Sequence, residues 1–485
     1  MMHRTSSLRA ATALGMMLVM TGCAVGPDFH RPPAPPAAAY AHVPEGKPGT
    51  QAVVTGADIP ADWWAVFHSP ALDTLVRRAI AANPDLEAAR AALRQSQELM
   101  KAERGALFPS VSAEASIERA RNPGTLASPL DSGSNLYTLH TAQLNVAYAP
   151  DLFGGTRRQI EASAAAAEVQ RFQVEATYLT LTSNVVVAAI TEASLRAQID
   201  ATQKSIAAQA RVLDILRGRL RLGDAARADV AAQETLLAQT EQSLPPLQKQ
   251  LAQQHDLISA LTGQMPDGEP PRFDLDTLSL PRDLPLSLPA KLVDQRPDIR
   301  AAEANLHAAA AQVGVAIAAR LPAITLGGSV GGSSTNFSTL LAPDNILWTI
   351  VGGLTAPLFD GGALLHRKHA ADAAYDQAKA QYRSAVLAGF QNVSDALAAI
   401  GADTDALHAA ERAERAASDS LTITQGQMRL GAVAQFQVLN AEQAYWQTSV
   451  TLQQARASLL SDTAALMQAL GGGWWNRHPA SDSHS

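Results

Sequence analysis

Residues 109–118 read Pro-Ser-Val-Ser-Ala-Glu-Ala-Ser-Ile-Glu, and residues 322–331 read Pro-Ala-Ile-Thr-Leu-Gly-Gly-Ser-Val-Gly. After each proline, apolar residues alternate with polar or small ones, and a period of two predicts a β-strand. A second extended segment follows each stretch after a loop. The sequence therefore predicts four strands, at about 110–120, 136–149, 323–333 and 345–358.

The predicted strands have one apolar and one polar face, because successive side chains of a strand point to opposite sides. The residues expected on the apolar face are Val111, Ala113, Ala115, Ile117, Ile324, Leu326, Gly328, Val330, Ile346, Trp348, Ile350 and Leu354. Those expected on the polar face are Ser110, Ser112, Glu114, Ser116, Glu118, Thr325, Gly327, Ser329, Gly331, Thr349, Gly353 and Thr355.

Such strands are long enough to cross a membrane when tilted. A four-stranded sheet could not stand alone there, because its two edges would leave backbone groups unpaired in hydrocarbon. Single-chain barrels begin at eight strands, so closure requires several copies. Two copies would enclose an interior filled by side chains, whereas three would leave an aqueous lumen. The small polar face favours a channel, and a soluble sheet packed on helices is the alternative.

An internal repeat orders the whole chain. Asn83-Pro84-Asp85-Leu86 corresponds to Arg296-Pro297-Asp298-Ile299, and Pro109 corresponds to Pro322, both at an offset of 213. The turns discussed below correspond at an offset of 208. Matching blocks in the same order indicate one structural unit of about 210 residues, present twice.

Long helices are expected in each repeat. No proline occurs between residues 151 and 244, and a helix over about 156–217 would rise roughly 90 Å. A turn at 221–224 precedes a return helix that Pro245 and Pro246 should kink. The second repeat follows the same plan, with a helix from about 363, a turn at 430–431 and a return to about 470. The predicted fold class is mainly α with β.

The chain has 485 residues, of which 47% are hydrophobic, 17% charged and 5% aromatic. A net charge of −7 argues against nucleic-acid binding, which needs a basic face. The single cysteine excludes an intramolecular disulfide and a multi-cysteine zinc site.

The N-terminus has the pattern of a secretory signal, because Arg4 and Arg9 precede an apolar run of 11 residues at 10–20. No later segment has 18 consecutive apolar residues, so no membrane-spanning helix is expected. The Pro/Ala-rich stretch at 29–40 is expected to be an extended spacer.

Small residues precede Cys23 as in the lipobox of bacterial lipoproteins. Blocks along the whole chain resemble the TolC-like outer membrane efflux proteins, specifically the NodT-type lipoprotein branch that serves resistance-nodulation-division pumps. The matching blocks are 22–32, 62–67, 83–86, 296–303, 357–362 and 469–474. The resemblance implies cleavage before Cys23 and acylation of that residue, palmitate included.

The resemblance also implies a homotrimer with a 12-stranded transmembrane β-barrel, a long periplasmic α-barrel and an equatorial region near 265–295 and 471–485. The implied partners are outer-membrane lipid, a periplasmic adaptor and an inner-membrane pump of the resistance-nodulation-division type. The protein would be a passive outer-membrane duct for small molecules such as drugs or other toxic compounds, with no enzymatic step and no cofactor. The exported substrate stays open.

In such proteins the two helical turns lie at the periplasmic end, where they gate the tunnel and dock the adaptor. The resemblance assigns this role to the turn residues Arg221, Leu222, Gly223, Arg429, Leu430 and Gly431. The family places aspartates after the second turn, at an acidic constriction. Here Gln437 and Asn440 occupy those positions. In the first repeat, the position equivalent to Gln437 does carry an aspartate, Asp229. We therefore expect a less acidic aperture with weaker cation selectivity.

The expected division of the chain has six segments. They are a signal peptide (1–22), a lipid-anchored N-terminal segment (23–62), a first repeat (63–262), an equatorial linker (263–295), a second repeat (296–470) and a C-terminal tail (471–485).

The sequence pattern also bears on two other classes of function. A non-pore lipoprotein with periplasmic helical hairpins, acting as a structural or adaptor component, would not need two strand pairs with a lipid-facing side. An anchored enzyme would need a catalytic set, but the G-x-S-x-G pattern at 327–331 lies within an alternating strand instead of a strand-to-helix turn. His366 and His369 lack the further ligands of a metal site, so none is predicted.

Overall fold

The computed structural model describes residues 24–33, 39–44, 51–125, 134–268 and 271–477, so that the signal segment, Cys23 and residues 478–485 of the tail lie outside the described residues. The chain divides into two compact units. The sheet unit comprises Met1–Pro32, Leu93–Gln170 and Ala302–Tyr382, and the hairpin unit comprises Pro33–Ala92, Arg171–Ala301 and Arg383–Ser485.

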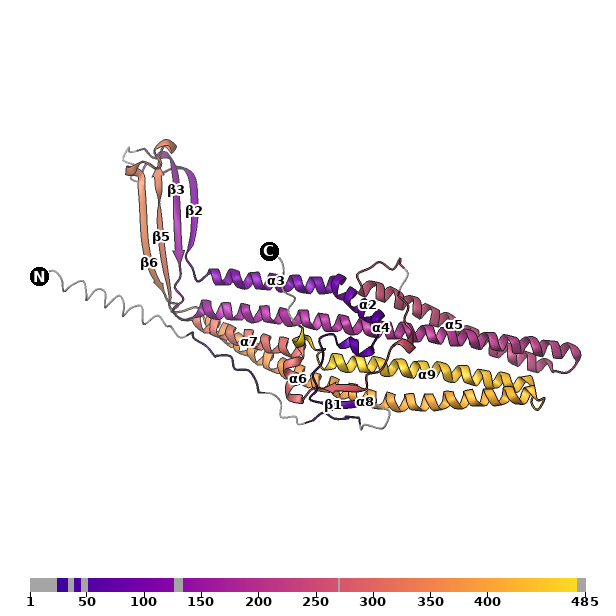
Figure 1. The fold of residues 1–485 in the computed structure, drawn as a ribbon. Helices are drawn as coiled ribbons and strands as arrows, with labels where there is room; N and C mark the ends of the chain where they lie inside the picture. The colour runs from indigo at the N-terminus through magenta and orange to yellow at the C-terminus, as the bar shows by residue number, and fades with distance from the viewer. Residues whose placement is uncertain (1–23, 34–38, 45–50, 126–133, 269–270, 478–485) are drawn as a thin grey trace. The chain divides into compact units, whose positions relative to one another are not determined.

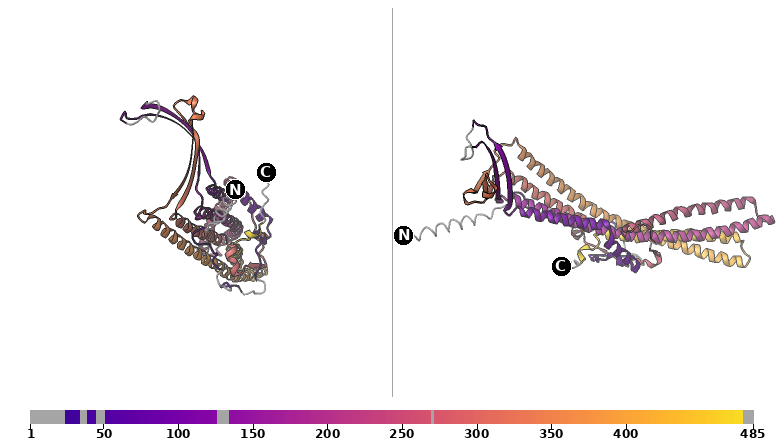
Figure 2. Two further views of the ribbon diagram at one scale, coloured as in Figure 1. Left: turned by 90° about the vertical axis from the view of Figure 1, so that its left-hand side faces the viewer. Right: turned by 90° about the horizontal axis from the view of Figure 1, so that it is seen from above.

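One antiparallel sheet dominates the sheet unit (Figures 1 and 2). Its strands are β2 (Ser110–Arg121), β3 (Leu136–Tyr148), β5 (Ala323–Ser334) and β6 (Ile346–Thr355), in the order β2-β3-β5-β6. All four predicted strands are present. The last one ends at Thr355 instead of residue 358, because Pro357 cannot donate a backbone hydrogen bond. The edge strands of this sheet are β2 and β6.

The internal repeat is confirmed by helices of matching length. The first-repeat helices are α3 (Pro84–Gly105), α4 (Gly155–Leu222) and α5 (Arg227–Leu261), with 22, 68 and 35 residues. Their counterparts are α7 (Pro297–Ala318), α8 (Ala363–Arg429) and α9 (Gln435–Ala469), with 22, 67 and 35 residues. Both Pro245 and Pro246 lie inside α5.

The residues just before α3 and α7, Asn83 and Arg296, each donate a hydrogen bond to the end of the last helix of their repeat. The Asn83 carboxamide accepts from the backbone N–H of Asp85 and Leu86 at 3.0 and 3.1 Å, as an N-cap does. Its Nδ2 donates to the carbonyl of Leu261 at the end of α5. In the second repeat, Arg296 donates to the carbonyl of Ala469 at the end of α9, at 2.8 Å. The sequence correspondence is therefore also a correspondence of tertiary contacts.

The hairpin unit also contains short elements that the sequence did not predict. Strand β1 (Ala52–Thr55) pairs in parallel with β4 (Asp283–Leu286) from the expected linker. The other short elements of this unit are η1 (Trp63–Phe67), α2 (Pro70–Ala82), η2 (Leu275–Thr277), α6 (Pro289–Gln295) and η5 (Trp474–Asn476). Trp63 and Phe67 are fully buried in the main core.

No membrane-spanning helix was expected, but two helices are long and apolar enough to be candidates for one. Both α4 and α8 contain an 18-residue window that is apolar enough to cross a membrane, and 56% and 33% of these windows are buried, respectively. Many apolar side chains of α4, such as Val186 and Ile190, belong to the main core. Helix packing therefore accounts for much of the apolar character of α4.

Candidate functional site

The strand register separates an apolar face from a polar face across all four strands. Directly paired residues of antiparallel strands lie on the same side of a sheet. One row across the sheet consists of Ala113, Leu144, Val330 and Trp348, and the neighbouring row consists of Ser112, Asn145, Ser329 and Thr349. The alternation expected from the sequence is thus continued from strand to strand. Serine 329 lies mid-strand, which excludes a nucleophile elbow at this position.

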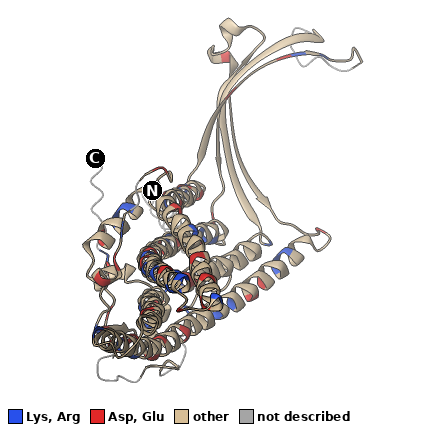
Figure 3. Cartoon of the chain, turned by 90° about the vertical axis from the view of Figure 1, so that its right-hand side faces the viewer, with Lys and Arg blue, Asp and Glu red and all other residues tan. Residues whose placement is uncertain are grey.

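Among the described residues, none covers most of the apolar face of β6. Trp348 and Leu354 are each 71% exposed and Ile350 is 80% exposed. Figure 3 shows that charged residues are sparse on this sheet and frequent on the helices. An exposed apolar band of this kind marks a surface that meets lipid or a partner.

Exposed aromatic and apolar residues border the sheet where its strands meet the helices. Phe108 precedes β2 and is 70% exposed, and Leu358 and Phe359 follow β6 and are 96% and 93% exposed. Tyr148 is the last residue of β3. Aromatic residues at such a border are typical of the interface level of a membrane barrel.

A buried arginine clamps the N-terminal segment onto the sheet unit. Arg158, near the start of α4, is 5% exposed. It donates to the carbonyl of Val25 at 3.1 Å, to Asp28 at 2.7 Å and to Glu161 at 2.8 Å. Hydrogen bonding to Arg158 lowers the pKa of the Asp28 carboxyl. Burial raises the pKa of Glu161, but hydrogen bonds from Arg158 and His307 outweigh it and the net shift is downward.

Further contacts extend this N-terminal clamp along residues 24–31. The Phe29 ring stacks on His307 with centroids 4.4 Å apart, and Arg31 pairs with Glu303 at 3.0 Å. A Cβ on Gly154 would lie 2.5 Å from the Cα of Ala24, so only glycine fits this close approach. The described residues of the expected spacer at 29–40 form no helix or strand, as expected. They are not a free spacer, however, because Phe29, Arg31 and the buried Tyr40 all make packing contacts.

The two hairpin turns have the same geometry. Gly223 has φ of +83° and Gly431 has φ of +72°. In the first turn Asp224 donates to the carbonyl of Arg219 at 2.9 Å, and in the second Ala432 donates to that of Gln427 at 2.9 Å. These are Schellman caps, which need a left-handed residue after the helix.

The residues predicted at these turns project into solvent. Leu222 is 79% exposed and Leu430 is 86% exposed. Arg221 and Arg429 are exposed as well, and neither makes an ion pair within the described part of the chain. Both turns thus expose a leucine together with an arginine that has no ion-pair partner among the described residues.

The predicted aperture residues begin the return helices. Asp229 accepts from the backbone N–H of Ala226 at 3.2 Å, so its carboxylate caps α5. Gln437 and Asn440 are exposed and lie three positions apart, on one face of α9. The hydrogen bond of Asp229 gives it a structural role that sequence reasoning missed.

Packing joins the two hairpins near their turns. Leu439 of α9 packs in a small core with Val212 and Leu216 of α4 and Val230 of α5. Arg217 pairs with Glu234 inside the first hairpin at 2.7 Å, whereas Glu442, the repeat equivalent of Glu234, lies 3.9 Å from Arg211 of the other hairpin. Equivalent carboxylates therefore serve different contacts.

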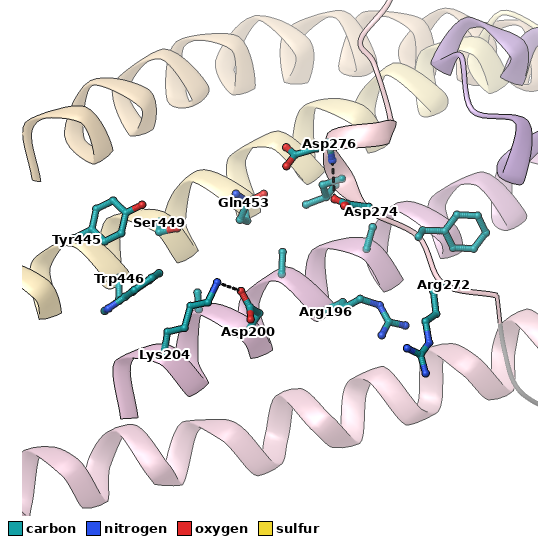
Figure 4. A pocket seen from close by; sticks show the side chains of 15 residues that line it. Arg196, Asp200, Lys204, Arg272, Asp274, Asp276, Tyr445, Trp446, Ser449 and Gln453 are labelled. Carbon is teal, nitrogen blue, oxygen red and sulfur yellow. Dashed lines mark hydrogen bonds and ion pairs between the residues drawn. The ribbon is translucent and has the colours of Figure 1, made fainter. Parts of the chain in front are cut away.

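A groove of about 560 Å³ lies farther along the hairpin unit, between α4, α9 and the η2 segment (Figure 4). Lys204 donates to Asp200 at 2.5 Å and lies 5.5 Å from the ring centroid of Trp446. Across the groove Asp276 accepts from Arg456 at 3.1 Å. Paired charges and aromatic edges line this groove, and the described residues contain no group of three or more metal-ligating side chains.

Two carboxyl groups meet between α8 and α9. Asp462 shares a side-chain hydrogen bond with Asp403, and burial together with Asp403 raises the pKa of Asp462 to about 6. Arg296 and Asp395 line the small cavity beside it. The ordinary aspartate pKa is near 4, so the folded hairpin binds more protons than the unfolded chain between about pH 4 and 6. The pair's stabilisation is full below pH 4 and lost as the pH rises to about 6.

Asp462→Asn is expected to flatten this pH dependence, because asparagine keeps a hydrogen-bond donor toward Asp403 without a second charge. Thermal unfolding of the detergent-solubilised protein at pH 4 to 7.5 measures the effect. The matched control is Asp419→Asn on the exposed face of α8. If the pH profile of Asp462→Asn equals that of the wild type, the carboxyl pair is not the cause of the pH dependence of stability.

Comparisons with known proteins agree with this architecture. A family model described as "Outer membrane efflux protein" matches residues 75–264 and 288–472. A pyoverdine export outer membrane protein of Pseudomonas putida is 30% identical over 420 residues, covering 85% of this chain and 88% of the relative. A toluene efflux pump outer membrane protein of Pseudomonas putida is 29% identical over 463 residues, covering 95% and 94%.

Solved structures of the same kind superpose well. The outer-membrane channel OprN has a TM-score of 0.81 at 26% identity and covers 93% of this chain and 100% of its own. The Campylobacter jejuni CmeC outer membrane channel has a TM-score of 0.84 at 21% identity, with 93% and 95% covered, and shows the fold alone.

Proposed function

Because this chain belongs to the outer membrane efflux protein family, we propose that three copies close their sheets into one 12-stranded barrel around a passive export duct. The observation that carries this proposal is the described sheet, which has one apolar face and two unpaired edge strands. Pairing β2 of one copy with β6 of the next satisfies both edges. The polar row of each sheet then lines the lumen, and no chemical step is required.

We propose further that Cys23 is acylated and anchors the chain in the membrane. The N-terminal clamp supports this, because it fixes Val25 and Asp28 on Arg158, and the backbone N–H of Val25 donates to the carbonyl of Phe153, five residues after the end of β3. Cys23 directly precedes Ala24, which packs closely against Gly154 just after the end of β3, so acylation of Cys23 would tether this part of the sheet unit to lipid. Several acyl chains anchor stably where a single chain does not.

The hairpin turns are proposed as the docking surface for a periplasmic adaptor, which links the duct to an inner-membrane pump. Their exposed leucines support this assignment, as do Arg221 and Arg429, which form no ion pair with any residue that the structure describes. Relatives are named as parts of toluene efflux pumps and of pyoverdine export.

Two measurements on the purified full-length protein test the duct. We expect heat-modifiable trimer migration on gels and stepwise ion conductance in planar bilayers. The second candidate, a non-pore hairpin lipoprotein, predicts neither, and its only support is the pair of long hairpins. A monomer that passes no current would overturn the duct.

Asn440→Asp is expected to raise the cation preference of the channel. Asn440 is exposed on α9 one turn after the second hairpin turn, and three copies of the variant would place three added carboxylates around the axis. The reversal potential in asymmetric salt measures the change, and Gln377→Glu, which adds the same charge at an exposed position of α8 far along the helix from the turn, is the control. An unchanged reversal potential would remove Asn440 from the constriction.

A further inference from the structure

The apolar face of β2 carries two arginines at its far end. Along that face, two arginines, Arg119 and Arg121, follow the apolar residues Val111, Ala113, Ala115 and Ile117. The register pairs these arginines with Thr138 and Leu136 of β3, so they stay on the same face as the apolar residues. The face that meets lipid therefore changes from apolar to cationic within one strand.

Both arginines lie at the end of the sheet opposite the helices. Strand β2 begins at Ser110, just after α3, and ends at Arg121. At about 3.4 Å per residue, Arg119 and Arg121 lie about 7 and 14 Å beyond Ile117. The strand ladder continues to the next residue, where Asn122 donates to the carbonyl of Asn135 at 2.7 Å. The two arginines are thus held on ordered backbone.

No side chain of the described residues compensates these two charges. Arg119 and Arg121 are exposed, and neither makes a hydrogen bond or ion pair within that part of the chain. The acidic residues of β2, Glu114 and Glu118, lie on the opposite face, where Gln143 and Asn145 each donate to Glu114 at 3.3 Å. The cationic charge on the outer face is therefore available to a ligand.

Resting on the proposed barrel, we propose that Arg119 and Arg121 form a binding site for the phosphate groups of lipid A at the outer rim of each subunit. A guanidinium is costly in hydrocarbon, so a pair beyond the apolar band belongs at headgroup level, where long side chains reach polar groups. The outer leaflet of an outer membrane presents the phosphorylated glucosamines of lipid A there. Arginine binds phosphate oxygens through two parallel N–H donors.

The test uses purified trimers in detergent and follows their thermal dissociation while Kdo2-lipid A is added. We expect lipid A to raise the dissociation midpoint of the wild type, and Arg119→Gln/Arg121→Gln to weaken its apparent affinity by about tenfold or more, as the loss of charged hydrogen bonds implies. Arg94→Gln/Arg104→Gln, exposed on α3, removes the same charge elsewhere and should bind as the wild type does. Arg119→Lys/Arg121→Lys keeps the charge without the guanidinium fork, and its apparent affinity for lipid A should lie between those of the wild type and the glutamine variant. If the glutamine variant fails to assemble, an affinity of the lysine variant below that of the wild type tests the site.

Three outcomes would overturn the site. Equal stabilisation by dephosphorylated lipid A would exclude the phosphates, and equal stabilisation by phosphatidylglycerol would indicate unspecific attraction of anionic lipid. Asp344→Asn alters the segment before β6. If it lowers the dissociation midpoint measured without lipid as far as the double glutamine variant does, the arginines pair with the neighbouring copy instead of with lipid. Conductance of the variants is recorded in parallel, so a failure of the lipid site with intact current leaves the duct standing.

Discussion

Ile350→Lys is expected to prevent stable assembly in the outer membrane, whereas Val351→Lys, one residue along the same strand, is expected to leave assembly intact. Ile350 lies on the apolar face opposite Gly328 and is 80% exposed, and Val351 lies on the polar face opposite Gly327. A lysine on the lipid face of a barrel costs about 2–4 kcal/mol near the membrane midplane. Each trimer would carry this cost three times.

The measurement is the amount of heat-modifiable trimer in the outer-membrane fraction. Val351→Lys is the matched control, because it adds the same charge to the same strand. In bilayers it should also shift the reversal potential toward anions, since it adds cations to the lumen. Equal loss of trimer in both variants would show that the two faces of the sheet do not contact lipid on one side and water on the other.

Glu192→Ala is expected to release the linker that joins the two repeats. Glu192 of α4 is fully buried, and its carboxylate accepts from Arg196, from the backbone N–H of Phe273 at 3.0 Å and lies 3.2 Å from His255 of α5. Removing one partner of a buried charged network costs about 3–5 kcal/mol. The buried Phe273 of this linker belongs to the main core, and the Glu192 carboxylate holds its backbone N–H there.

Glu234→Ala is the control for this experiment, because it breaks the exposed pair with Arg217, which is worth at most about 1 kcal/mol. Proteolysis of the segment 264–282 and thermal unfolding report local and global effects separately. Glu192→Gln, which keeps an acceptor for the Phe273 N–H, should be intermediate. Similar protease resistance in Glu192→Ala and Glu234→Ala would refute the anchor.

Much of the fold could be predicted because it depends on local periods. The alternation around Val111 and Ile324 predicts strands, and the long proline-free stretches predict the hairpin helices. The turn glycines Gly223 and Gly431 were recognisable because a Schellman cap needs a left-handed residue. The docking and aperture roles of the turn residues remain proposals, because they depend on neighbouring molecules.

The buried charge networks could not be predicted. Arg158 is one of 38 basic residues, and nothing in its local sequence shows that it binds Val25 and Asp28, more than 100 residues away. The same holds for Glu192 and Phe273. One signal was available for the N-terminal clamp, since Gly154 and Gly26 mark places of close backbone approach.

The sequence by itself determined the repeat, the strand faces and the hairpin turns, because each depends on spacing within a short window. Only the tertiary structure decided which strands pair, which carboxylates are buried and where the N-terminal segment lies. These depend on contacts between residues far apart in the chain, and the free energy of such contacts comes from burial and geometry that no local pattern encodes.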